Sequence, residues 1–307
     1  MKRPPQLELY RIREIYEVIN DTFAFLRQHF NRLSYCLLLF AGSPVLLLVL
    51  AEMALYSRVD VTGLGLHSFT QADTPAQLLL AVLLMLVALL EPVLVAATVY
   101  QYLWMTTQSI SFSVEAVGRG VWQKMPLLLA LTVAYGIGLL LSALCLLLPA
   151  VFFSISYAMI LVMPFFSPQP TLWGYFQFST YLLSNKSATF EPAKWVKLFI
   201  LLFTIFIISF LFSYLLQVFA FLARVFILMF DVSNTTRSAN YSNQIFWSIY
   251  RALLFLGGIW VSAITLLALA FQYFSFVEQK KAIGLLWRIE NLGKSTIFEE
   301  DEEEATY

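Results

Sequence analysis

The feature that most constrains this chain is a long stretch without charge. From Met125 to Asn185 the sequence contains no Asp, Glu, Lys or Arg, and residues Leu127 to Phe166 are almost entirely apolar apart from a break at Pro149. Water cannot solvate such a run, and one helix of that length would exceed the hydrocarbon thickness of about 30 Å. The stretch therefore predicts two membrane-spanning helices that form a hairpin at Pro149.

The composition of the whole chain agrees with this interpretation. Of its 307 residues, 60% are hydrophobic and only 12% are charged, and the mean hydropathy is +0.77. These values are typical of a protein that crosses the membrane several times. We therefore expect an all-α fold, namely a polytopic transmembrane helical bundle with about six spans and with interfacial amphipathic helices.

The apolar runs divide the chain into three parts. Residues 1–32 are expected to form a cytoplasmic or interfacial amphipathic helix, residues 33–276 the six-span membrane domain, and residues 277–307 a cytoplasmic helix with a disordered acidic tail. Besides the hairpin, the predicted spans are Leu33–Tyr56, Ala76–Met105, Trp195–Phe230 and Ile249–Phe276. Ala76–Met105 is longer than the hydrocarbon core is thick, so it requires tilt, a kink at Pro92 or protrusion into the interface.

Four shorter segments show the periodicity of amphipathic helices. In residues 9–30 one apolar face favours a helix in the plane of the membrane interface, although packing on the protein's own loops would produce the same pattern. Ser113 is expected to cap a second short helix, which Pro126 ends. The remaining two segments are Thr171–Asn185 and Lys280–Leu292.

The distribution of Lys and Arg predicts the orientation of the chain. On a six-span topology, only Arg58, Arg224, Arg237 and Arg251 fall on one side of the membrane. The N-terminus, the C-terminal segment and two connections carry all the other Lys and Arg residues. Because cytoplasmic loops are enriched in these residues, both termini are expected in the cytoplasm.

A resemblance supports this architecture. It rests on Pro149, Tyr157–Pro164, Trp173, Ser179, Trp195–Phe199 and Tyr273–Gly284. These residues mark a hairpin, a proline at its exit, an aromatic helix, and a Trp and a Lys at the start of the next span. This arrangement resembles the polytopic membrane domain of bacterial glycerophosphodiester phosphodiesterases and related stand-alone integral membrane proteins. The resemblance implies a multi-pass protein of the bacterial inner (cytoplasmic) membrane. It implies no reaction, because this sequence contains no phosphodiesterase barrel.

The sequence offers little for catalysis or metal binding. Its two histidines, His29 and His67, have no histidine or cysteine at ligand spacing, and Asp60 and Asp73 only accompany His67 in a polar loop. No phosphate-binding loop and no serine–histidine pair occurs. We therefore expect a non-enzymatic protein with no catalytic residue, no cofactor, no metal and no nucleic-acid partner.

Ionisable residues within the apolar runs form the candidate site, because charge is costly at membrane depth and usually serves a purpose there. Glu91 precedes Pro92 near the middle of the second span, where the proline leaves one helical carbonyl without its donor. Two interpretations are kept: a polar cavity or proton relay at this break, or a structural carboxyl inside the bundle. The candidate intramembrane polar site also includes Arg224 as the partner of Glu91 or Glu52, and Asp231.

Two functions follow as hypotheses, and the lipid bilayer is a partner in both. The first is a non-enzymatic integral membrane protein that organises or assists a membrane complex with partner subunits, because interfacial helices are combined with a basic N-terminus and an acidic C-terminus. The alternative is a lipid or amphiphile transporter or flippase-like component, which the Glu91-Pro92 break and the aromatic surfaces favour.

Overall fold

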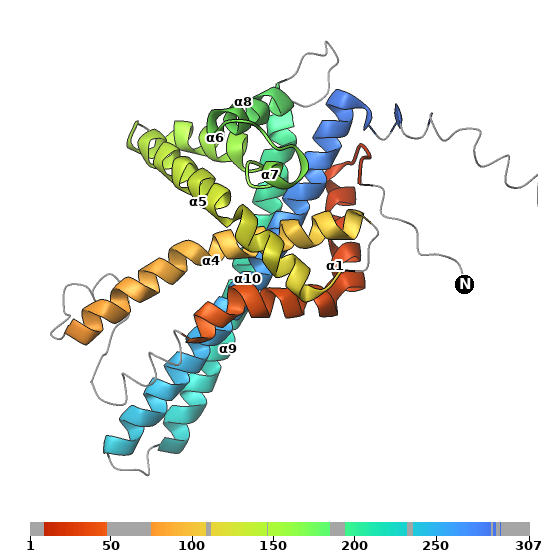
Figure 1. The fold of residues 1–307 in the computed structure, drawn as a ribbon. Coiled ribbons are helices and arrows are strands. Elements are labelled where there is room, and N and C mark those ends of the chain that lie inside the picture. Colours follow the sequence, from red (N-terminus) through yellow and green to blue (C-terminus); the bar gives the residue numbers. More distant parts are fainter. Residues whose placement is uncertain are drawn as a thin grey trace, which may run out of the picture.

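The computed structural model describes residues 9–47, 75–108, 112–145, 147–184, 194–231, 236–283, 285–286 and 289, in some helices by the backbone alone. Of the described residues 89% are helical and none lies in a strand, which confirms the all-α class. The helices meet in one common core, from which several of them project (Figure 1).

The helices follow the predicted apolar runs. They are α1 (Ile15–Leu37), the π-helical turn η1 (Leu38–Gly42), α4 (Pro75–Thr107), α5 (Val114–Cys145), α6 (Leu147–Tyr157), α7 (Met163–Phe166), α8 (Leu172–Leu183), α9 (Lys194–Asp231) and α10 (Thr236–Lys281). After η1 the chain stays helical to Leu47. The predicted domain boundary between residues 32 and 33 therefore lies inside a continuous helix.

Side-chain caps fix the starts of several helices. The Ser113 hydroxyl accepts a hydrogen bond of 3.3 Å from the amide of Ala116, which confirms Ser113 as the cap of α5. The expectation that Pro126 ends this helix is wrong, because α5 runs through it. Pro126 has no amide hydrogen, so the carbonyl of Trp122 loses its helical hydrogen bond. Both residues are exposed, and the missing hydrogen bond costs least on an exposed side of a helix.

Two helix segments form the centre of the core. Val93–Leu103 of α4 and Leu267–Glu278 of α10 are buried along their whole length, and these two helices pack on each other. Apart from a few buried polar residues such as Gln101, Gln272 and Glu278, these segments are apolar on all sides, as expected of helices in such a position. α1 packs against both central helices, α5 packs against α4, and α8 packs against α10.

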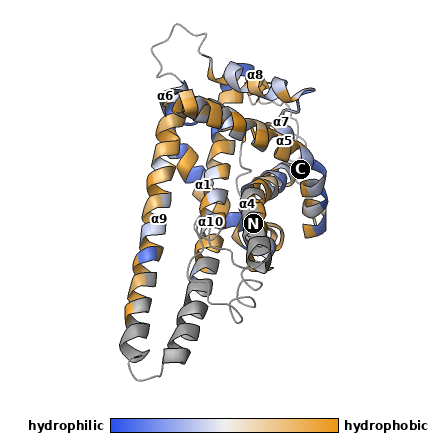
Figure 2. Ribbon diagram, turned by 90° about the vertical axis from the view of Figure 1, so that its left-hand side faces the viewer, coloured by the Kyte–Doolittle hydropathy of each residue, from blue (hydrophilic) through white to orange (hydrophobic). Residues whose placement is uncertain are grey.

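α9 and α10 leave the core side by side as a long hairpin (Figure 2). α9 has 38 residues and α10 has 46, so they are about 57 Å and about 69 Å long. Beyond the core the apolar side chains of α9, such as Phe206, Phe210 and Leu211, are 59–64% exposed. In the described part of the chain no other segment covers these side chains. An apolar surface that other segments leave uncovered is what contact with lipid requires.

Among the described residues, four helical segments are long and apolar enough to cross a membrane: Ile15–Leu47, Val114–Cys145, Lys194–Phe219 and Leu253–Lys281. By length and composition the chain is thus a membrane protein. α4 coincides with the predicted second span, but α6, with 11 residues and about 16 Å, is too short for the predicted fourth. The count of six spans is therefore not confirmed.

A tertiary hydrogen bond coincides with the early end of α6. The hydroxyl of Ser179 in α8 donates to the carbonyl of Ser156, which would otherwise accept the next helical amide. The amide of Ile160 instead bonds to the carbonyl of Tyr157 at 3.0 Å. The chain then continues in short turns to α7, so that a predicted span becomes a short helix and an irregular connection.

Two neighbouring glycines give a matched test of the packing between α5 and α6. A Cβ atom at Gly138 would overlap the ring of Phe153, whereas nothing lies within 4 Å of a Cβ atom at Gly136. Gly138→Ala is expected to lower the free energy of unfolding by about 1–2 kcal/mol through overpacking. Gly136→Ala should raise it slightly through helix propensity. Thermal unfolding in mild detergent measures both, and equal Tm values for the two variants would contradict the packing.

Candidate functional site

The structure places two of the predicted site residues. Glu91 lies half-buried in α4, just before the fully buried segment of that helix, and Pro92 is exposed within the same helix. In the described ranges no hydrogen bond or ion pair reaches the Glu91 carboxylate. Glu52 and the side chains of Arg224 and Asp231 lie outside the described residues. The pairing of Glu91 or Glu52 with Arg224 thus stays a prediction.

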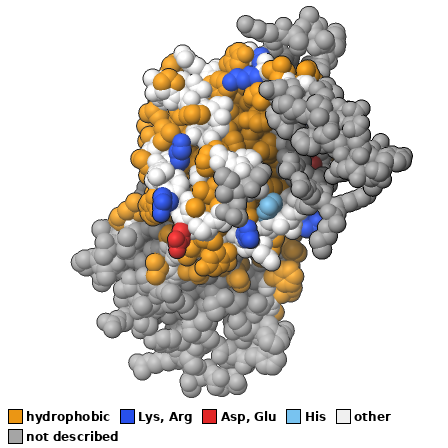
Figure 3. Space-filling view, turned by 45° about the vertical axis from the view of Figure 1, so that its right-hand side comes forward, with side chains coloured by type: hydrophobic (Ala, Val, Ile, Leu, Met, Phe, Trp, Pro, Cys, Tyr) orange, Lys and Arg blue, Asp and Glu red, His pale blue; other side chains and the backbone are white. Residues whose placement is uncertain are grey.

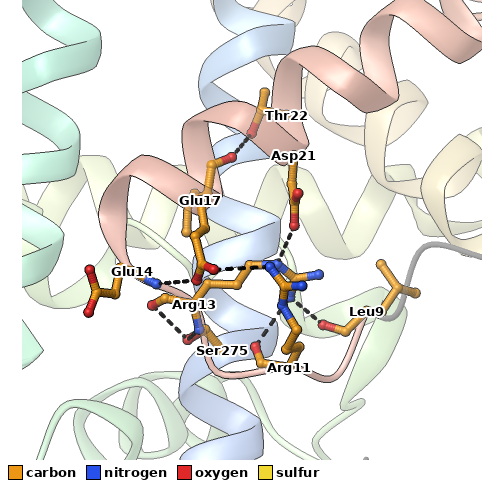
Figure 4. Close-up of polar contacts among 9 residues, drawn as sticks. Leu9, Arg11, Arg13, Glu14, Glu17, Asp21, Thr22 and Ser275 are labelled. Atoms are coloured by element: carbon orange, nitrogen blue, oxygen red, sulfur yellow. Dashed lines mark hydrogen bonds and ion pairs between the residues drawn. The ribbon is translucent and has the colours of Figure 1, made fainter. Parts of the chain in front are cut away.

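The structure brings together a different polar group where the chain enters α1. We call it the Arg13 cluster, and it consists of Leu9, Arg13, Asp21, Phe271 and Ser275. Figure 4 shows its polar contacts among Leu9, Arg13, Asp21 and Ser275. The side chain of Arg13 is 1% exposed, and its Nε atom lies 2.7 Å from Oδ2 of Asp21. Burying a guanidinium is costly unless a counter-charge and hydrogen-bond acceptors surround it.

The remaining contacts of Arg13 provide those acceptors. Its Nη1 donates to the carbonyl of Leu9 at 2.7 Å, and its backbone amide donates to Oγ of Ser275 at 2.9 Å. The guanidinium carbon lies 5.3 Å from the centre of the Phe271 ring. Ser275 and Phe271 belong to α10, so the cluster ties the beginning of the chain to a central helix of the core.

The local fold before α1 positions Arg13. Glu14 is the N-cap of α1, and its amide donates to Oε2 of Glu17 at 3.0 Å in a capping box. Because residues 11–14 are not helical, Arg13 reaches Asp21 although the two are eight positions apart. A second ion pair, Arg11–Glu17 at 3.3 Å, is exposed.

The C-terminal end of α10 lies beside this cluster. The ring of Tyr10 packs edge-on against Phe274, with 5.3 Å between the ring centres. Burial raises the pKa of the Tyr10 phenol, and the negative charge of Glu278 raises that pKa further. Glu278 is buried and accepts a hydrogen bond of 3.0 Å from the amide of Leu285. Between these two residues the backbone of Ala282 has a φ of 50°. The phenol therefore stays neutral.

Lysines at the same end attach α8 to α10. Nζ of Lys280 donates to the carbonyl of Ser184 at 2.6 Å and lies 5.0 Å from the centre of the Tyr181 ring. Nζ of Lys281 lies 5.1 Å from the centre of the Phe178 ring. Such cation–π contacts keep the ammonium groups at the surface while their stems cover aromatic residues.

A cavity of about 430 Å³ lies farther along α1. We call it the Arg27–Arg32 cavity, after the six consecutive residues that line it: Arg27, Gln28, His29, Phe30, Asn31 and Arg32. Nδ1 of His29 lies 3.3 Å from the hydroxyl oxygen of Tyr102 in α4, and the imidazole packs against the ring of Phe25 in a tilted arrangement, with 4.6 Å between the ring centres. The lining thus combines cationic and amide groups that bind anions.

Over the described ranges, no three His, Cys, Asp or Glu side chains come together as metal ligands. The loop that contains Asp60, His67 and Asp73 lies outside those ranges. The expectation of a protein without metal, cofactor or catalytic residue therefore stays a prediction.

The two polar sites differ in how visible they are in the sequence. The Arg13 cluster depends on Ser275, which is 262 positions away, so no spacing rule predicts it. The Arg27–Arg32 cavity did leave a signal: between Thr22 and Leu47 two arginines occur without any Asp or Glu.

No family model, curated protein or solved structure matches this chain. The resemblance to the membrane domain of glycerophosphodiester phosphodiesterases therefore stays a prediction. The bacterial inner membrane and the cytoplasmic position of both termini stay predictions as well.

Two arginines that each pair with a carboxylate test the role of burial. Arg13→Gln is expected to lower the free energy of unfolding by about 3 kcal/mol, because Asp21 and the carbonyl of Leu9 lose a buried partner. Arg11→Gln, which removes an exposed pair, should cost less than about 1 kcal/mol. Thermal unfolding in detergent compares the two variants. Equal losses would show that burial of the Arg13–Asp21 pair adds nothing to stability.

Proposed function

We propose that this protein organises or assists a membrane complex, without catalysing a reaction, and that α9 binds a partner membrane helix. The proposal is supported by one side of α9, which we call the aromatic face. It consists of Phe199, Phe203, Phe206, Phe210 and Gln217. The four phenylalanines are 41–64% exposed, and Gln217 is exposed as well.

The aromatic face is separate from the side of α9 that packs on the protein. Leu198, Leu201 and Ile205 of α9 are buried, and Leu216 lies next to Gly257 of α10. At 100° per residue these positions fall on the other side of the helix from the aromatic face. The phenylalanines therefore project away from the core.

The spacing of the aromatic face is that of a helix–helix contact. Its phenylalanines alternate steps of four and three residues, which is the repeat that keeps one stripe of a helix against a partner helix. Neighbouring rings also stack, with 6.1 Å between the centres of Phe199 and Phe203 and 6.5 Å between those of Phe206 and Phe210. The stripe is thus an ordered ridge before any partner binds.

Gln217 is the observation that carries the proposal. It is exposed on the same face, in a segment of α9 without charge, and no hydrogen bond joins its amide to another described side chain. An amide in hydrocarbon without a partner costs several kcal/mol, and lipid tails offer no hydrogen bond. An amide or hydroxyl on a neighbouring membrane helix does, and such bonds stabilise helix pairs in membranes.

The transporter alternative would use a polar cavity that reaches the Glu91-Pro92 break. Glu91 is not among the described residues that line the Arg27–Arg32 cavity, so this cavity does not support that route. Transport therefore stays an untested alternative to the organising role.

Site-specific photo-crosslinking in native membranes tests the docking of α9. A photoreactive phenylalanine analogue in place of Phe210 is expected to form an adduct with one protein of defined mass, because a partner helix covers this residue. Gln217→Leu in the same chain should reduce that adduct severalfold, since it removes the interhelical hydrogen bond. Gel electrophoresis and mass spectrometry identify the adduct.

The control is the same analogue at Leu211, which is 59% exposed but lies beside the aromatic face. This position should label lipid. Labelling of lipid alone at both positions, or a protein adduct that Gln217→Leu leaves unchanged, would contradict the proposal.

A further inference from the structure

The side chains that line the Arg27–Arg32 cavity belong neither to the Arg13 cluster nor to the aromatic face. The cavity has a volume of about 430 Å³ and is open to the surface of the protein on one side. Its lining offers guanidinium, amide and imidazole groups beside the ring of Phe30. No carboxylate is among the described residues that line it.

The two arginines of the cavity have free hydrogen-bonding capacity. Within the described ranges neither Arg27 nor Arg32 makes a hydrogen bond or an ion pair, although Arg11 and Arg13 on the same segment are both paired. Asp21 is the carboxylate nearest to them along α1, and it binds Arg13. Guanidinium groups prefer phosphate and carboxylate oxygens, which they bind in pairs.

The position of the cavity along α1 favours one source of phosphate. After Arg32 the helix carries no charge as far as Leu47, and Tyr35, Leu38 and Leu39 are 43–59% exposed. A change from arginines to exposed apolar and aromatic side chains along one helix marks the level of lipid headgroups. Figure 3 shows a face of this kind, with Lys or Arg and His side chains among apolar ones.

We propose that the Arg27–Arg32 cavity binds the phosphate of an anionic phospholipid. Arg27 and Arg32 bind the phosphate oxygens, and the amides of Gln28 and Asn31 donate to the remaining headgroup oxygens. His29, held by Tyr102, closes the cavity toward α4. The acyl chains follow the exposed side chains of Tyr35 and Leu38. This site is independent of partner binding on α9.

Lipid binding to the purified full chain in detergent tests the site. Native mass spectrometry and the shift of Tm are measured with phosphatidylglycerol, phosphatidylcholine and inorganic phosphate at matched concentrations. Phosphatidylglycerol is expected to bind and to raise Tm, and the other two should do so far less. In the Arg27→Gln/Arg32→Gln variant, its affinity should fall by about fivefold for each arginine removed.

The controls separate lipid binding from general charge and from folding. Arg119→Gln removes an exposed arginine on α5 outside the cavity, and it should leave the affinity unchanged. The double variant should keep the lipid-free Tm, because its arginines stabilise nothing within the described chain. If its Tm falls, Arg27→Lys/Arg32→Lys, which keeps the charge but not the paired geometry, should bind phosphatidylglycerol more weakly than the wild type.

Three results would overturn the proposal. One is an unchanged affinity for phosphatidylglycerol in the variants of Arg27 and Arg32. The second is equal binding of phosphatidylcholine, which lacks the net negative charge. The third is a shift of Tm by inorganic phosphate as large as that by phosphatidylglycerol, which would identify a site for a free anion.

Discussion

The structure depends on one constraint: a polar side chain among apolar ones needs a hydrogen-bond partner, because neither lipid nor the core supplies water. Within the helices the hydroxyl groups meet this constraint locally. Thr98, Thr204 and Thr265 each donate to the carbonyl four residues earlier, at 2.7–2.9 Å. These bonds hide the hydroxyls on their own helices and leave the helix surfaces apolar. Larger polar groups cannot be hidden in this way, and they determine how the helices are connected.

Arg13 and the hydroxyl of Ser179 show what polar groups do when their partner lies on another segment. Arg13 cannot be buried without Asp21 and the carbonyl of Leu9, so the chain before α1 stays non-helical and lies against α10. The hydroxyl of Ser179 bonds to the carbonyl of Ser156, and α6 ends one residue later. In both places a helix begins or ends where a polar group bonds to a distant segment of the chain.

The difference between local contacts and contacts with a distant segment also explains how much of the fold the sequence could predict. The apolar runs predicted α4, α9 and α10, since a helix buried or lipid-covered all round needs no specific partner to be recognised. Ser113 was recognisable as a cap because its contact is local. The end of α6 was not, because it depends on Ser179, which lies on another helix. The aromatic face needed only the spacing of Phe199, Phe203, Phe206 and Phe210, so the sequence contained it, but its exposure is known only from the packing of α9.

Polar groups without a partner can be sorted by whether another molecule can reach them. The hydroxyl of Tyr100 and the side-chain oxygen of Gln272 are buried without a partner among the described residues, and only an internal water could satisfy them. Arg27, Arg32 and Gln217 are exposed, so a lipid headgroup or a partner helix can satisfy them from outside. Glu91 is half-buried beside the exposed Pro92 and belongs with this second group. Glu278 has a partner inside the core, the amide of Leu285, whereas no partner of Glu91 lies among the described residues. Both interpretations of Glu91, structural and functional, therefore stay predictions.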